Sequence, residues 1–133
     1  MKNIKDLNIG DELQRVELDP VSRIDLIKYA GASGDYNPIH TIDEKAKSLG
    51  LPGVIAHGMW TMGNLAKLFT PFYHQGFLKD YTIRFKGMVF LDDVITLKAK
   101  LREIDGYSYI FNVAAQNQQS KDVIKGEIVY QII

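Results

Sequence analysis

Apolar and polar residues alternate with a period of two through much of the C-terminal half of the chain. This period is typical of antiparallel strands that bury one face. Asp105-Gly106 separates two of the alternating runs and is a strong signal for a hairpin turn. Strands are predicted over residues 81–85, 95–102, 107–116 and 123–132. Most of the second half of this chain is therefore restricted to a sheet with one buried face.

A helix that is apolar on nearly all sides precedes these strands. Between residues 58 and 69 only Asn64 and Lys67 are clearly polar. Such a helix must be covered on most sides, so it is expected to form the core. Pro71 is expected to end it, because proline cannot continue the hydrogen-bonding ladder.

Shorter elements in the N-terminal half complete the predicted fold. A strand is predicted at residues 12–19. Helices are predicted at residues 23–32 and 42–49, each opened by a capping signature, Ser22 with Asp25 and Thr41 with Glu44. With 133 residues the chain has the size of one domain. We therefore predict a single α+β domain over residues 1–133, with an antiparallel sheet of about five strands wrapped on the long central helix.

The composition excludes several classes of partner and site. Lys plus Arg and Asp plus Glu both number 16, so the zero net charge gives no reason to expect nucleic acid or an anionic membrane as partner. The absence of cysteine excludes a disulfide scaffold, a thiolate nucleophile and a Cys-ligated metal. The first residues lack the apolar region of a signal peptide, and no apolar run approaches the roughly 18 residues of a membrane span. The cytoplasm is the expected location.

A short polar loop offers a carboxylate and an imidazole close together. Asp35 and His40 are separated by four residues that favour turns, among them Asn37 and Pro38. Such a segment can bring the two side chains face to face as an acid/base pair. Ala56-His57-Gly58 then leads into the apolar helix, whose first backbone N–H groups are free to bind an anion. One segment therefore combines a proton-handling pair with an oxyanion site.

Three stretches carry a resemblance to a known family. They are Ala32-Ser33-Gly34-Asp35-Tyr36-Asn37-Pro38-Ile39-His40, Ala56-His57-Gly58-Met59 and Arg84-Phe85. With these motifs the chain resembles the MaoC-like, (R)-specific hydratases and dehydratases, which have a hotdog fold. One departure follows Arg84-Phe85, where the family often has a Pro-containing segment that ends in Gly-Asp. Residues 87–93 of this chain contain no proline and end in Asp92-Asp93.

The resemblance implies an activity and a set of site residues. The activity is (R)-specific hydration of trans-2-enoyl thioesters, or the reverse dehydration of (3R)-hydroxyacyl thioesters, in fatty-acid metabolism. The acyl group would be carried by coenzyme A or an acyl carrier protein, and no metal or other cofactor is needed. By similarity, Asp35 and His40 polarise a water molecule, Asn37 orients the pair, and the Gly58 N–H binds the thioester oxygen. The substrate-binding residues would be Gly58, His57, Met59 and Trp60.

The resemblance also implies a dimer, because hotdog proteins usually pair their sheets and bind the acyl chain between subunits. A homodimer is expected, and a heterodimer with a related hotdog subunit is the alternative.

Other interpretations of the same residues remain open at this stage. Asp35 alone would often cap a turn, His40 and His57 would often be structural histidines, and Gly58 would often serve only close packing. A hotdog thioesterase is one alternative function, but such enzymes generally place an acid on or near the core helix, and residues 59–69 contain none. A non-catalytic acyl-thioester-binding subunit is the other, although such a role does not need Asp35 and His40 together.

Overall fold

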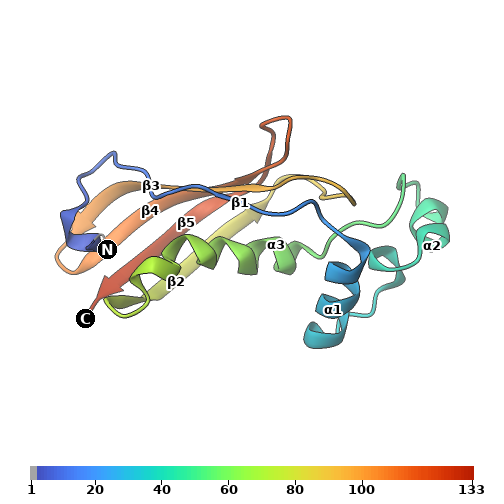
Figure 1. Cartoon of the computed structure of the whole chain (residues 1–133), viewed down its shortest axis with the longest axis horizontal. Coiled ribbons are helices and arrows are strands. Elements are labelled where there is room, and N and C mark those ends of the chain that lie inside the picture. The colour runs from blue at the N-terminus through green and yellow to red at the C-terminus, as the bar shows by residue number, and fades with distance from the viewer. Residues whose placement is uncertain (1–2) are drawn as a thin grey trace.

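The computed structural model describes residues 3–133 and contains one five-stranded antiparallel sheet. The strand order is β1-β3-β4-β5-β2. Figure 1 shows a helix, α3, lying along one face of this sheet, while α1 and α2 lie beyond one end of it. The strands are β1 (Val16–Glu17), β2 (Gly76–Phe85), β3 (Thr96–Asp105), β4 (Ser108–Gln116) and β5 (Asp122–Ile132). The α+β architecture with five strands on a central helix is as the sequence predicts.

The helical elements are mostly short. The α-helices are α1 (Arg23–Ser33), α2 (Asp43–Ser48) and α3 (Gly58–Leu65), and the 3₁₀ helices are η1 (Ile4–Asp6), η2 (Pro38–His40) and η3 (Ala66–Phe72). Within the described residues, no helix is long and apolar enough to cross a membrane.

The hairpin between β3 and β4 forms where Asp105-Gly106 predicts it. Asp105 pairs with Ser108 across the turn, and Gly106 has a positive φ of 60°, which glycine adopts without steric cost. The inward residues of β4 alternate as expected and are almost fully buried: Tyr109, Phe111, Val113 and Ala115. The period-two pattern therefore identified the buried face of β4. It was incomplete for β2, which begins at Gly76 and not at the predicted residue 81.

The core helix differs from the predicted one at its C-terminal end. The α-helix ends at Leu65 and continues as the 3₁₀ helix η3, with Pro71 inside η3 and not beyond the helix. A proline ring clashes with the carbonyl four residues earlier in an α-helix, and 3₁₀ turns are frequent at helix C-termini. The expectation that this helix is covered on most sides is also only partly met, since Met59 is 56% exposed.

The N-terminal predictions are partly confirmed. The Ser22–Asp25 capping box is present at the start of α1. The strand predicted at 12–19 is reduced to β1, with an isolated bridge from Glu12 to Lys100. Thr41 does not cap α2, whose N-cap is Ile42 without a side-chain hydrogen bond; the turn of η2 takes up Thr41 instead, and its N–H donates to the Pro38 carbonyl.

Candidate active site

Asp35 and His40 face each other across the loop between α1 and η2. Gly34 ends α1 in the left-handed conformation, and Asn37 is the N-cap of η2, so the chain reverses within a few residues. His40 Nε2 lies 3.8 Å from Asp35 Oδ2. This distance is too long for a direct hydrogen bond, and it is short enough for one water molecule to contact both atoms. The acid/base pair predicted from the sequence is therefore brought together.

A backbone carbonyl fixes the orientation of the His40 ring. His40 Nδ1 lies 2.7 Å from the Ile55 carbonyl oxygen, and a carbonyl can only accept, so Nδ1 carries the proton. In the neutral imidazole, Nε2 is then an acceptor that points at Asp35. The His40 side chain is 9% exposed and that of Asp35 is 52% exposed, so the pair has one buried and one accessible member.

Asn37 contacts Asp35 through its backbone. The Asn37 N–H donates to Asp35 Oδ1 at 3.2 Å, which leaves Oδ2 directed toward His40. The Asn37 side-chain oxygen accepts from the Ile39 N–H at 3.2 Å. The orientation of the pair by Asn37 thus has a structural basis in the main chain, while a role for the Asn37 amide stays a prediction.

His57 lies directly behind the pair. Its ring stacks on that of His40 with centroids 3.8 Å apart, and the edge of Tyr29 packs on it at 4.8 Å. His57 Nε2 donates to the Asp35 backbone carbonyl at 3.1 Å. The residue is 2% exposed, and its Nδ1 has no hydrogen-bond partner among residues 3–133. Burial holds the pKa of the His57 imidazole below its ordinary value of 6.5, against the opposing effect of the Asp35 carbonyl.

We expect His57 to make stability depend on pH in the acidic range. Below pH 6.5 the unfolded chain binds a proton at His57 that the buried ring resists, so the free energy of unfolding should decrease as pH falls from 6.5 to the lowered pKa. One such proton contributes a slope of at most about 1.4 kcal/mol per pH unit. Urea unfolding at several pH values should show a shallower slope for His57→Gln, with His74→Gln as the matched exposed-histidine control. Equal slopes for His57→Gln and wild type would contradict this expectation.

Gly58 opens α3 beside an aromatic ring. A Cβ atom placed on Gly58 would lie 2.6 Å from the Phe85 ring, which real Cβ atoms do not tolerate, so only glycine fits here without movement. No side chain caps the helix start, and the N–H groups of the first turn are available in the way that helix N-termini bind anions.

A cavity of about 190 Å³ is lined by both Gly58 and His40. Its lining includes His40, Gly58 and Phe85. The remaining walls come from the segment before α3, from α3 itself, from the segment after β2 and from β5: Ile55, Ala56, Thr61, Gly87, Met88, Val89, Val123 and Ile124. Asp35, Asn37, His57, Met59 and Trp60 do not line this cavity. The sequence analysis did not identify Ile55, Thr61 and Ile124 as residues of the site. The one available signal was the apolar pattern of the last strand, which includes Ile124.

Three donor groups of the site could hold a metal ion. Ligand atoms of Asp35, His40 and His57 all lie within 4.8 Å of one another. The chemistry expected from the sequence needs no metal, because a carboxylate and a neutral imidazole can polarise water directly.

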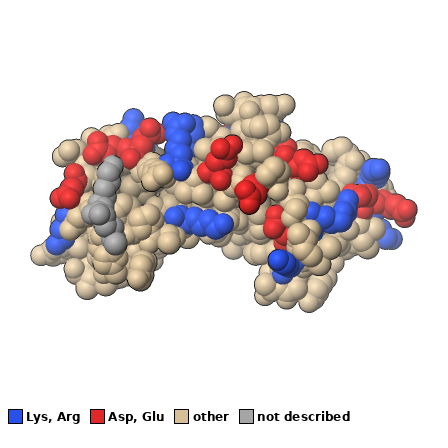
Figure 2. All heavy atoms as spheres, in the orientation of Figure 1, with Lys and Arg blue, Asp and Glu red and all other residues tan. Residues whose placement is uncertain are grey.

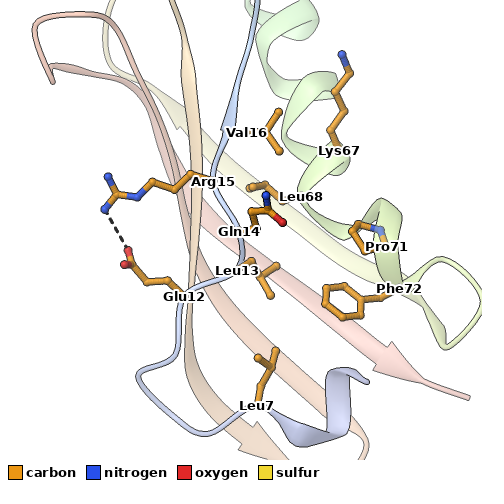
Figure 3. Close-up of a pocket in the computed structure, with 10 residues that line it drawn as sticks. All are labelled: Leu7, Glu12, Leu13, Gln14, Arg15, Val16, Lys67, Leu68, Pro71 and Phe72. Carbon is orange, nitrogen blue, oxygen red and sulfur yellow. Dashed lines mark ion pairs between the residues drawn. The ribbon is translucent and has the colours of Figure 1, made fainter. Parts of the chain in front are cut away.

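A larger cavity lies elsewhere in the molecule. It has a volume of about 540 Å³ and lies between η3 and the N-terminal segment, where Leu13, Leu68 and Phe72 form its floor (Figure 3). Its charged groups are Lys67 and the Glu12–Arg15 ion pair, with atoms 3.6 Å apart. It contains no pair of groups suited to proton transfer, so the smaller cavity beside His40 is the candidate active site.

Comparison with known proteins finds a matching family and several relatives. The MaoC like domain family matches residues 5–123. A fatty acid synthase subunit beta from Aspergillus oryzae is 31% identical over 108 residues, which are 78% of this chain and 5% of that protein. A 3-hydroxybutyryl-CoA dehydratase from Methylorubrum extorquens is 29% identical over 102 residues, 75% of this chain and 64% of that protein. The chain thus spans less than two thirds of these curated relatives.

A solved structure shares the fold. The unliganded R-hydratase PhaJ1 from Pseudomonas aeruginosa superposes with a TM-score of 0.86 and 23% identity, covering 96% of this chain and 83% of that one. The hotdog fold expected from the sequence resemblance is therefore confirmed.

Proposed function

The chain belongs to the MaoC-like domain family, and we propose that it is a hydro-lyase that adds water to trans-2-enoyl thioesters with (R) specificity, or removes it from (3R)-hydroxyacyl thioesters. One observation carries the proposal: the Asp35 carboxylate and His40 Nε2 lie 3.8 Å apart beside a cavity that Gly58 also lines. Relatives of the chain are named as a fatty acid synthase subunit and a 3-hydroxybutyryl-CoA dehydratase, which favours fatty-acid metabolism.

The geometry divides the chemistry among three groups. Hydration requires a base to take a proton from water as its oxygen bonds to C3, a proton delivered to C2, and stabilisation of the negative charge on the thioester oxygen. A water held between Asp35 and His40 loses its proton to the pair, and the pair supplies the proton to C2.

Gly58 supplies the third requirement. Its N–H lies at the positive end of α3, where the helix dipole adds to the attraction for an oxyanion. The absence of a side chain lets the thioester approach the backbone, while Phe85 and Ile124 wall the acyl group. Asp35 and His40 hold water from one loop, so a single face of C3 is attacked and the product has one configuration. The choice of (R) rests on the resemblance of the sequence motif to the (R)-specific family.

The direct test is the hydration of crotonyl-CoA. Loss of the absorbance of the conjugated thioester, with an R-3-hydroxybutyryl product on chiral analysis, is the expected result. Release of free thiol would instead favour the thioesterase alternative. Tight binding of the thioester without turnover would favour a binding subunit.

We expect Gly58→Ala to lower kcat/KM for crotonyl-CoA by about tenfold to a hundredfold, the range that follows loss of part of an oxyanion site. The added methyl group would displace Phe85 from its position 2.6 Å away and crowd the thioester oxygen. Gly63→Ala is the matched control, because nothing lies within 4 Å of its Cβ position in the same helix. That variant should keep its activity and gain about 1 kcal/mol in stability. Equal activities of the two variants would contradict the role of Gly58.

We also propose a homodimer formed through β2. The sheet order leaves β2 at an edge, where its ten residues pair only with β5, and a long free edge is a template for pairing with another strand. Phe77 and Phe85 on this strand are 53% and 56% exposed. Light scattering should give about 30 kDa, twice the 15.1 kDa of the chain. A mass of one chain that doubles only when a second hotdog subunit is added would favour the heterodimer.

A further inference from the structure

A second hollow lies across the sheet from the candidate active site. Phe85 and Ile124 are register partners that line the active-site cavity. Successive side chains of a strand point to opposite faces, so their neighbours Arg84 and Lys125, also register partners, point to the other face. There they line a hollow of about 390 Å³. We call it the basic hollow; its lining is Thr82, Ile83, Arg84, Lys86, Asn112, Lys125, Gly126 and Glu127.

The charges of the basic hollow are unbalanced. Four ion pairs within 4.0 Å are found among residues 3–133, and none includes Arg84, Lys86 or Lys125. The one carboxylate of the lining, Glu127, already binds Arg102 at 2.9 Å. Arg84 and Lys125 also stand directly opposite each other on neighbouring strands, where like charges destabilise a sheet. A bound anion would remove that repulsion.

The charges of the basic hollow contrast with those on the face of the molecule that Figure 2 shows. Figure 2 shows Lys and Arg interspersed with Asp and Glu over the face turned to the viewer, without a large patch of one sign. The chain as a whole has a net charge of zero. Three unpaired cations around one hollow are therefore a local feature and not a consequence of a basic protein.

The segment at the end of β2 connects the two sites. Gly87 and Met88 line the active-site cavity, while Arg84 and Lys86 line the basic hollow. The N–H groups of Lys86 and Gly87 both donate to the Val123 carbonyl, at 2.8 and 3.2 Å, which holds the segment against β5. One short segment, residues 84–88, therefore contributes to the lining of both sites.

We propose that the basic hollow binds the phosphate groups of the nucleotide portion of coenzyme A when the thioester lies in the active-site cavity. This inference rests on the proposed function. The Arg84 guanidinium can form two parallel hydrogen bonds to one phosphate. Lys86 and Lys125 add compact charges, and the Asn112 side chain lines the same hollow as a neutral hydrogen-bonding group. A thioester without phosphates cannot form these ionic and hydrogen-bonding contacts.

The kinetic test compares two substrates that differ only in the nucleotide portion. Crotonyl-CoA carries the phosphates, and crotonyl-pantetheine does not. We define the ratio as kcat/KM for crotonyl-CoA divided by kcat/KM for crotonyl-pantetheine. This ratio should fall about threefold in Arg84→Gln and in Lys125→Gln, and about tenfold in the double variant, as expected for charge pairs near the surface. Arg84→Lys keeps the charge and loses the paired hydrogen bonds, so it should lower the ratio by less than Arg84→Gln does. Lys5→Gln removes one exposed lysine on η1 and is the matched control. An unchanged ratio in the double variant would overturn the proposal.

A binding test does not depend on turnover. In isothermal titration calorimetry at low ionic strength, adenosine 3′,5′-bisphosphate should bind the wild-type protein. The binding should weaken in about 0.5 M salt, because exposed charges are screened. The double variant Arg84→Gln/Lys125→Gln should bind the bisphosphate at least about tenfold more weakly than wild type. Equal affinity of wild type and the double variant, or activity with an acyl carrier protein without bisphosphate binding, would overturn the coenzyme A site. The wild type could also bind the bisphosphate, with binding lost in the double variant, and yet hydrate no thioester. That outcome would uphold the site and refute the proposed function.

Discussion

Asp35→Asn is expected to lower kcat for the hydration of crotonyl-CoA by at least about a thousandfold, within the range that a positioned acid/base group contributes. The amide cannot accept a proton from water, and its NH₂ group would face His40 Nε2, which accepts because Nδ1 donates to the Ile55 carbonyl. Absorbance of the enoyl thioester measures the effect directly.

This substitution separates catalysis from structure. The Asn side-chain oxygen can still accept the Asn37 N–H, which is the one hydrogen bond that the Asp35 carboxylate makes within the described chain. If Asp35 only capped the turn, Asp35→Asn would retain most of its activity. Asp19→Asn, which changes another exposed carboxylate, is the matched control, and thermal unfolding should show that all three proteins are folded. Retention of more than a tenth of the wild-type rate would refute the catalytic role.

Phe111→Ala is expected to reduce the free energy of unfolding by about 3–5 kcal/mol, as is usual when a large side chain is removed from a core. Phe111 is fully buried on the inner face of β4. Its ring meets the edge of Phe69 on η3, with centroids 5.1 Å apart. The residue therefore joins the sheet to the central helix, and the cavity left by alanine would open at that contact.

The measurement is urea unfolding at neutral pH. Since small domains are stable by about 5–15 kcal/mol, Phe111→Ala should remove a large part of the stability or abolish folding. Tyr107→Ala, from the adjoining turn and 69% exposed in the wild type, is the matched aromatic control and should change stability by less than about 1 kcal/mol. A loss for Phe111→Ala no larger than that of the control would show that the helix does not pack on β4 as described.

The sequence patterns were most informative where a local rule decides the structure. Alternation fixed the buried side of β4, and Asp105-Gly106 fixed the hairpin because glycine adopts the positive φ of 60° without steric cost. Ser22 with Asp25 marked the start of α1, because the side chain of each residue accepts a hydrogen bond from the backbone N–H of the other. The prediction that Thr41 caps the second helix was wrong, because Thr41 ends the 3₁₀ helix η2 instead.

The sequence by itself determined most of the strands, their buried face, and the chemical groups that meet in one loop, because these depend on neighbours within a few residues. Only the tertiary structure decided the orientation, protonated nitrogen and surroundings of those groups. Ile55 fixes the tautomer of His40, His57 supports that ring from behind, and Phe85 covers Gly58. Each contact joins segments that are well separated along the chain, and such contacts depend on the packing of whole elements, which no local pattern encodes.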